Sequence, residues 1–122
     1  MANPFVHVEL QTSDLPRARQ FYTSLFGWTL QDVSLPSGGS YTMIDVGGGT
    51  GGGMMINPVP DTPSHWLAYV GVDDIEASTK KAADLGATVL MGVTEVGAFG
   101  WMSVIVDPTG ATLALWKSKN PQ

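Results

Sequence analysis

Alternation of apolar and polar positions marks five stretches of the chain as half-buried strands, because successive side chains of a strand point to opposite faces. They are residues 5–10, 41–46, 66–72, 101–106 and 112–116. The same pattern is weaker at residues 28–33, 54–56 and 88–93. Between these stretches, residues 16–26 and 75–85 have the composition and spacing of helices. The pattern therefore predicts eight strands and two helices.

Both predicted helices have similar residues at their ends. Asp14 and Asp74 stand before them, where a carboxylate can accept a hydrogen bond from the first turn. Gly27 and Gly86 follow them, where glycine adopts a left-handed conformation without steric cost. We expect an N-cap and a left-handed C-terminal residue at both helices.

The two halves of the chain repeat one another. The N-cap aspartates are 60 positions apart (74 − 14), and the same offset takes Tyr41 to Trp101. Each half then has the order strand, helix, three strands, with repeats at about 3–58 and 64–118. The predicted fold is α+β, with two βαβββ repeats forming an open, cupped eight-stranded sheet and the helices on its outer face. We expect one domain over residues 1–122.

Strand alternation also predicts which side chains line the inner face of this cup. His7 and Glu9 share one face of the first strand, opposite Val8 and Leu10, which should lie under the helix. A mostly apolar wall with a few polar groups is typical of small-molecule sites. The predicted ligand-binding residues are Phe5, Tyr41, Met43, Met54, Ile56, Leu67, Tyr69, Trp101, Ser103, Ala114 and Trp116. The alternative is that another sheet or subunit covers this face as ordinary core.

Composition narrows the possible partners. Apolar residues make up 43% of the 122 residues, enough for a folded core, and the net charge is −5 with no run of Lys or Arg. Nucleic acid is therefore not an expected partner. No apolar stretch approaches the roughly 20 residues of a membrane span, and no basic segment with an apolar stretch opens the chain. We expect a cytoplasmic protein with no membrane partner.

A run rich in glycine, residues 47–53, separates two predicted strands of the first repeat. A phosphate-binding loop would continue with Lys and Ser or Thr and then a helix, whereas Met54 and Met55 follow here. The run is predicted to be a hairpin connection. A further hypothesis makes it a mobile lid over the cup, because glycine leaves the backbone loose.

Four short motifs carry a resemblance to a known family. They are Ser13-Asp14-Leu15, the segment FYTSLFGW at residues 21–28, Leu85-Gly86-Ala87, and Asp107-Pro108-Thr109-Gly110. The last has the residues that a type I turn prefers. Together they resemble the vicinal oxygen chelate superfamily of glyoxalase I, bleomycin-resistance proteins and extradiol dioxygenases, over nearly the whole chain. The resemblance implies the cupped fold and a small-molecule ligand.

In metal-dependent members, the resemblance implies four inward-facing ligands, one from the first and one from the last strand of each repeat. With the offset of 60, these positions are His7, Met54, Leu67 and Ala114. Only His7 carries a group that binds Mg²⁺, Mn²⁺, Fe²⁺, Ni²⁺ or Zn²⁺. We therefore expect no family-type metal site and no cofactor. The alternative is a divalent metal ion held by His7, Glu9 and His65, a two-histidine, one-carboxylate set.

Three functions remain open from the sequence. The first is binding of an apolar or aromatic small molecule, as drug-sequestering members of the resembled family do. The second is a lyase, isomerase or dioxygenase-type enzyme in which His7 and Glu9 are catalytic, although both could equally be structural. The third is a partner module without a small-molecule site. We also expect a homodimer, because single-length members of the resembled family pair and symmetric pairs are common.

Overall fold

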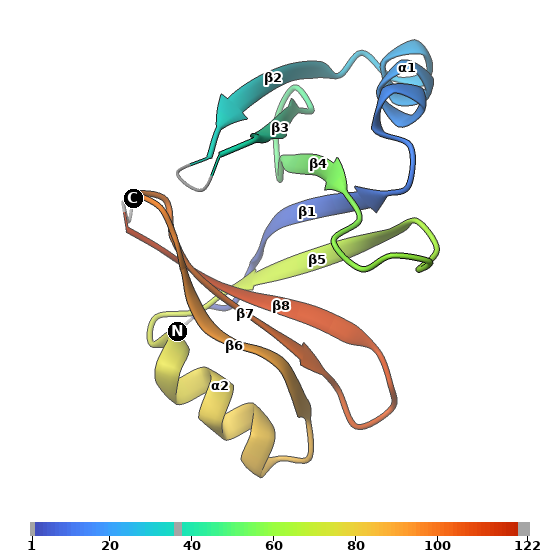
Figure 1. The fold of residues 1–122 in the computed structure, drawn as a ribbon. Helices are drawn as coiled ribbons and strands as arrows, with labels where there is room; N and C mark the ends of the chain where they lie inside the picture. The colour runs from blue at the N-terminus through green and yellow to red at the C-terminus, as the bar shows by residue number, and fades with distance from the viewer. Residues whose placement is uncertain (1, 36–37, 120–122) are drawn as a thin grey trace. The chain divides into compact units, whose positions relative to one another are not determined.

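The computed structural model describes residues 2–35 and 38–119. Its elements in chain order, drawn in Figure 1, are β1 (Phe5–Thr12), α1 (Leu15–Leu25), β2 (Thr29–Ser34), β3 (Ser40–Asp45), β4 (Gly52–Ile56), β5 (His65–Gly71), α2 (Ile75–Asp84), β6 (Thr88–Val96), β7 (Gly100–Val106) and β8 (Thr112–Ser118). The predicted α+β class with two βαβββ repeats is confirmed, including the three weakly patterned strands. No helix of the described residues is long and apolar enough to cross a membrane.

The chain forms two compact units. Residues 7–67 make the N-terminal unit, and residues 1–6 with 68–122 make the C-terminal unit. The strand order is β2-β3-β4-β1 in the first and β5-β8-β7-β6 in the second. In each unit the first strand of the repeat pairs in parallel with the last, and the other pairs are antiparallel. The two repeats therefore share one topology.

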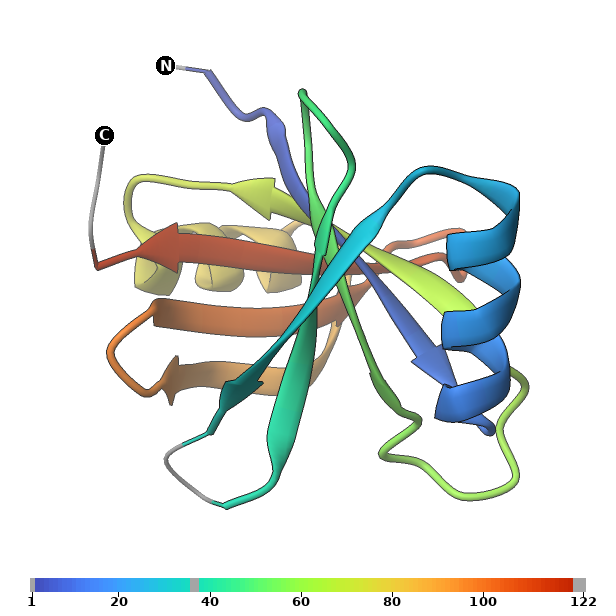
Figure 2. The same cartoon turned by 90° about the horizontal axis from the view of Figure 1, so that it is seen from above.

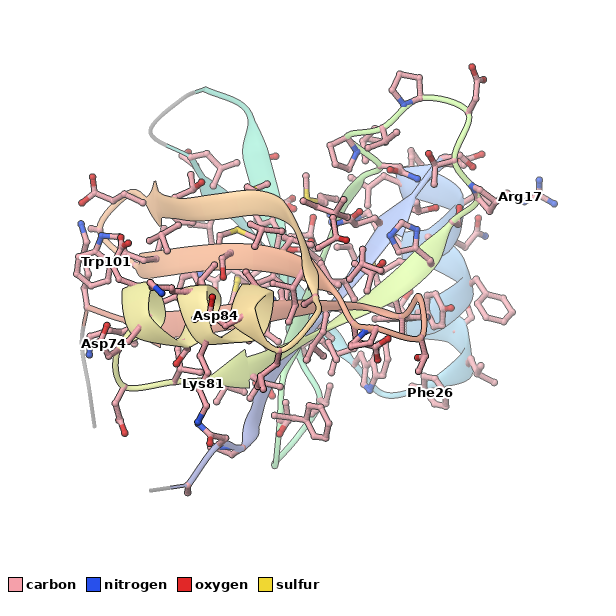
Figure 3. All side chains as sticks on the ribbon, turned by 90° about the horizontal axis from the view of Figure 1, so that it is seen from below. Arg17, Phe26, Asp74, Lys81, Asp84 and Trp101 are labelled. Carbon is pink, nitrogen blue, oxygen red and sulfur yellow. The ribbon has the colours of Figure 1, made fainter. Side chains whose placement is uncertain are left out.

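Both helices begin as the sequence predicts. The Asp14 side chain accepts a hydrogen bond from the backbone N–H of Arg17 at 3.1 Å. At α2, Asp74 accepts the equivalent bond from the N–H of Ala77 at 3.0 Å, and Figure 3 labels Asp74 at this end of the helix. Each cap satisfies a donor that the first turn of a helix leaves without an intrahelical partner.

The helices end differently, and one of the two predictions is wrong. Gly86 has the left-handed conformation expected of it, with a φ of +106°. At α1, Phe26, labelled in Figure 3, is extended instead, and its N–H donates to the carbonyl of Tyr22 at 2.9 Å. This conformation places the Phe26 ring 4.8 Å from that of Trp28. Gly27 is therefore not needed as a left-handed residue, and its φ is not positive.

The offset between the repeats is not constant. In the parallel pairs, Glu9 stands opposite Gly53, and Tyr69 stands opposite Ala114. Glu9 and Tyr69 differ by 60 positions (69 − 9), whereas Gly53 and Ala114 differ by 61 (114 − 53). A shift of one residue moves every side chain of a strand to its other face. Faces transferred from one repeat to the other with the offset of 60 are therefore wrong wherever the true offset is 61.

Each unit has a core between its helix and its strands. Leu10, Ile44 and Met54 are buried on the α1 side of the N-terminal unit. In the C-terminal unit, α2 packs across β6, β7 and β8, as Figure 2 shows. There the buried Thr79 hydroxyl donates to the carbonyl of Ile75 at 2.7 Å and accepts from the Ser103 hydroxyl at 2.8 Å. The helix-facing surfaces of β1, β3, β4 and β7 are thus identified by contact.

The turn before β8 forms as its residues indicate. The N–H of Gly110 donates to the carbonyl of Asp107 at 3.0 Å, which closes the four-residue turn. The Asp107 carboxylate accepts from the N–H and the hydroxyl of Thr109, both at 2.7 Å, and from the N–H of Ala111. These bonds, the Thr109 hydroxyl first, hold the pKa of the Asp107 carboxyl below its usual value.

Candidate functional site

A chain of hydrogen bonds crosses the face of the N-terminal unit that is turned away from α1. The Nε2 atom of His7 lies 2.8 Å from the Tyr41 hydroxyl, and that hydroxyl donates to Oε1 of Glu9 at 2.8 Å. Gln11 Nε2 donates to the other oxygen of Glu9 at 2.7 Å. We call the surface of β1, β3 and β4 that carries these residues the His7 face.

Strand alternation produces this arrangement. His7, Glu9 and Gln11 occupy alternate positions of β1, so all three side chains lie on one face of that strand. Tyr41 comes from β3, two strands away, since β4 pairs with both β1 and β3. Its side chain must therefore cross β4 to reach Glu9.

Gly53 makes that crossing possible. It stands opposite Glu9 on β4, directly in the path of the Tyr41 ring. A Cβ atom at Gly53 would lie 2.0 Å from the Tyr41 hydroxyl oxygen, a distance that no real Cβ contact permits. The position thus requires glycine for space, since Gly53 has no positive φ.

Burial sets the electrostatics of the site. Glu9 is only 5% exposed, and both of its oxygens accept hydrogen bonds from the neighbours described above. Burial lowers the pKa of His7, and the negative charge of Glu9 opposes this shift. The imidazole is therefore biased toward its neutral form, in which one ring nitrogen donates and the other accepts.

The predicted ligand-binding residues of the N-terminal unit fall on both faces. Tyr41 and Met43 lie on the His7 face, and Met43 is 40% exposed. Met54 does not, because it stands opposite Leu10 and is fully buried in the core beneath α1. Ile56 shares the parity of Met54 and is exposed on that same side. The inner faces predicted for Met54 and Ile56 are wrong, since the true counterpart of Ala114 is Gly53.

The same shift affects the C-terminal unit. Ser103 bonds Thr79 of α2, so Ser103 faces the helix, and Trp101 shares its parity two residues earlier on β7. The inner faces predicted for Trp101 and Ser103 are therefore wrong. Ala114 pairs with Tyr69 on the opposite face, where the rings of Tyr69 and Trp116 meet edge to face at 6.3 Å.

Phe5 and Leu67 complete the predicted set. Phe5 shares the parity of His7 along β1 and is 63% exposed. Leu67 shares the parity of Tyr69 along β5 and is buried. Both therefore keep the faces that alternation assigns to them.

The alternative metal site is not formed. His65, at the start of β5, places Nδ1 2.9 Å from the carbonyl of Pro63. Across residues 2–35 and 38–119, no three His, Cys, Asp or Glu side chains gather closely enough to hold a metal ion. Among the described residues, His7, Glu9 and His65 are therefore not brought together as a metal-binding group.

Two residues and one recess of the N-terminal unit were missed from the sequence. Gln11 and Gly53 belong to the hydrogen-bonded site, and the alternation that grouped His7 with Glu9 also extends to Gln11. On the α1 side, an apolar recess of about 280 Å³ is lined by the indoles of Trp28 and Trp66, whose rings meet edge to face at 6.3 Å. It is lined otherwise by Val8, Ile44, Val46, Thr50, Gly51 and Gly52. This recess contains no titratable side chain.

Comparison with known proteins places this arrangement in a family. The profile of the Glyoxalase/Bleomycin resistance protein/Dioxygenase superfamily matches residues 5–115. The chain belongs to this superfamily. It is 40% identical over 117 residues to the putative glyoxylase CFP32 of Mycobacterium tuberculosis, covering 91% of this chain and 44% of that protein. It is 33% identical over 124 residues to the anthracycline biosynthesis protein DnrV of Streptomyces peucetius, covering 89% and 45%.

Solved structures share the fold at low sequence identity. Methylmalonyl-CoA epimerase from Mycobacterium tuberculosis superposes with a TM-score of 0.73 at 16% identity, covering 95% of this chain and 88% of that one. A hypothetical protein, BH1468 of Bacillus halodurans, gives 0.76 at 14% identity, covering 100% and 99%. The chain spans less than half the length of the curated relatives it matches.

The superfamily's metal site does not fit this chain. Of the four positions predicted from the offset of 60, Met54 faces the core under α1. With the offset corrected to 61 for the last strands, its place is taken by Gly53, which has no side chain. Leu67 and Ala114 carry no ligand atom, so His7 is the single candidate among the four positions.

Proposed function

We propose that the protein binds a small, largely apolar or aromatic molecule on the His7 face, without a metal ion. The observation that supports this most directly is the Gln11–Glu9–Tyr41–His7 hydrogen-bond chain on a face that also exposes Met43. Ligand sites combine apolar surface with a few oriented polar groups. Of the four positions that correspond to the superfamily's metal ligands, His7 is the single one with a ligand atom. This supports a mode of binding in which side chains contact the molecule without a metal ion.

The relatives support an aromatic ligand. DnrV and DauV, which are 33% and 32% identical to this chain, are named for anthracycline biosynthesis. An anthracycline contains fused aromatic rings with oxygen substituents. Such a ligand would pack on Met43 and meet the polar atoms of His7 and Tyr41.

The test is a calorimetric titration of chelator-treated protein with anthraquinones and naphthols, with cyclohexanol as the non-aromatic control. Met43→Ala should weaken binding of a responding aromatic about fivefold, the equivalent of about 1 kcal/mol of lost apolar contact. Leu25→Ala is the matched control, because Leu25 is an exposed leucine on α1 and so on the other side of the strands. Equal losses in both variants, or no binding of any aromatic compound, would reject the proposal.

A second candidate function is enzymatic proton transfer of the isomerase or lyase type. The Tyr41 hydroxyl between His7 and Glu9 favours it, because a neutral imidazole linked to a carboxylate suits a general base. Methylmalonyl-CoA epimerase shares the fold. Methylmalonyl-CoA and simple acyl thioesters incubated with the protein in D₂O should gain deuterium beside the carbonyl. An equal rate of deuterium incorporation with His7→Gln and with the unmodified protein would reject this candidate.

We also propose a homodimer in the cytoplasm. The matched stretch fills only 44% of CFP32, which leaves that relative room for a second domain of this size. Two copies of the present chain would equal such a pair of domains in size, which supports a dimer. Multi-angle light scattering at micromolar concentration should give twice the monomer mass. A monomer mass at this concentration would reject the dimer without affecting the proposal for the His7 face.

A further inference from the structure

The direction of the hydrogen bonds on the His7 face assigns separate roles to its residues. Glu9 accepts a hydrogen bond from the Gln11 amide at 2.7 Å on one oxygen and from the Tyr41 hydroxyl at 2.8 Å on the other. A carboxylate only accepts, and a phenol has a single proton to donate. Because the Tyr41 proton goes to Glu9, the bond between Tyr41 and His7 must take its proton from His7.

We infer that Glu9 and Tyr41 are positioning residues that hold His7 as the tautomer protonated on Nε2, so that Nδ1 is the basic atom of the site. The inference deepens the proposed function, since it assigns the lone pair of the neutral His7 ring to Nδ1. It differs from the sequence prediction, in which Glu9 itself was a catalytic group.

Three observations of the structure support this division of roles. Glu9 is 5% exposed and already bonded at both oxygens, so proton transfer with a ligand would require it to break one of these bonds. Burial lowers the pKa of His7, which favours the neutral ring in which tautomers exist. Gly53 leaves room for the Tyr41 ring and so permits the link between the two groups. A carboxylate that orients a histidine through hydrogen bonding is a known way to select its tautomer.

Reversing the direction of the hydrogen bonds between Glu9, Tyr41 and His7 provides a specific test. Glu9→Gln introduces an amide whose oxygen can still accept from Gln11 while its NH₂ group donates to Tyr41. The Tyr41 hydroxyl then has its proton available for His7 Nε2. The inference therefore predicts that this variant changes the neutral His7 ring to the tautomer protonated on Nδ1. Tyr41→Phe removes the link and should give a mixture of the two tautomers.

The measurement is ¹⁵N NMR of histidine-labelled full-length protein without ligand, at a pH where His7 is neutral. Protonated and unprotonated ring nitrogens have distinct ¹⁵N shifts, and His65 in the same spectrum is the internal control. A single Nε2-protonated form in the unmodified protein, converted to the Nδ1-protonated form by Glu9→Gln, is the expected result. An unchanged tautomer in a folded Glu9→Gln variant, judged by its amide spectrum, would overturn the inference.

If the Glu9→Gln variant misfolds, Tyr41→Phe tests the inference instead. This variant keeps the ring over Gly53 and removes one oxygen atom. A tautomer population identical to that of the unmodified protein would overturn the inference, and a mixed population would support it. Because no ligand is present, failure here is distinct from failure of the titrations that test the proposed function.

Discussion

Replacement of Gly53 by alanine should displace the Tyr41 ring and so separate His7 from Glu9. The added methyl group would lie 2.0 Å from the Tyr41 hydroxyl oxygen and 2.2 Å from the ring carbon Cζ. The obstructing atoms are the far end of a side chain, so the ring can swing away while β4 stays paired. Glu9, which is 5% exposed, then loses the hydrogen bond that the Tyr41 hydroxyl donates to it.

The cost follows from that loss. A buried charged acceptor that loses a hydrogen bond costs about 2 kcal/mol, and for a domain of this size that lowers the melting temperature by roughly 8 °C. Calorimetry measures the change in melting temperature. Gly92→Ala is the matched control, since Gly92 is also a strand glycine without a positive φ and its Cβ would meet no atom within 4 Å. We expect that variant to retain the parent melting temperature within about 2 °C.

A double-mutant cycle tests the reasoning directly. Tyr41→Ala removes the ring that the new methyl group would strike, so adding Gly53→Ala to it should cost almost nothing further. The coupling between the two substitutions should exceed about 1 kcal/mol. Additive losses would refute the reasoning, because they would mean that Gly53 acts through something other than the Tyr41 ring.

Three further predictions follow from the packing and the charges. Gly52→Ala should cost more than Gly53→Ala and separate β1 from β4, because its Cβ would lie 2.1 Å from the backbone carbonyl oxygen of Val8; loss of amide protection in β1 by hydrogen exchange is the measurement. Ser103→Ala should cost about 1 kcal/mol in urea denaturation, since it removes the hydroxyl that donates to the buried Thr79 hydroxyl, which keeps its own bond to the Ile75 carbonyl. Because burial lowers the pKa of His7 below the unfolded value of 6.5, the free energy of unfolding should be highest above pH 6.5 and decrease as the pH falls toward the lowered pKa. Urea titrations at pH 8 and pH 5 check this sign, and a smaller decrease in the unmodified protein than in His7→Asn would contradict it.

Local features of the fold were predictable from the sequence. The N-caps at Asp14 and Asp74 depend on a side chain three residues from its donor, and the turn at Asp107 depends on four consecutive residues. Alternation along one strand likewise placed His7 and Glu9 together. In each of these cases the deciding interaction lies within a few positions of the chain.

Features that depend on distant pairing were not predictable. The faces of Met54 and Trp101 depend on the register between strands, and the change of offset from 60 to 61 has no signal in the residues themselves. The end of α1 depends on how Phe26 packs, rather than on Gly27. The need for Gly53 arises from a ring that reaches over it from β3, so the glycine run looked like a uniform loop although Gly52 and Gly53 belong to β4.

The irregular pairing of β6 has a consequence for aggregation. β6 and β2 are the last strands of their units, and such edges can recruit strands from other molecules. The β6 register shifts between Val89 and Met91 and again between Met91 and Thr94, and such bulges disrupt a regular edge. β2 pairs with β3 in one unbroken register from Thr29 to Ser34, and so keeps an even edge. Intermolecular strand addition in a destabilised variant should therefore begin at β2, and a lysine placed at the exposed Gln31 should suppress it.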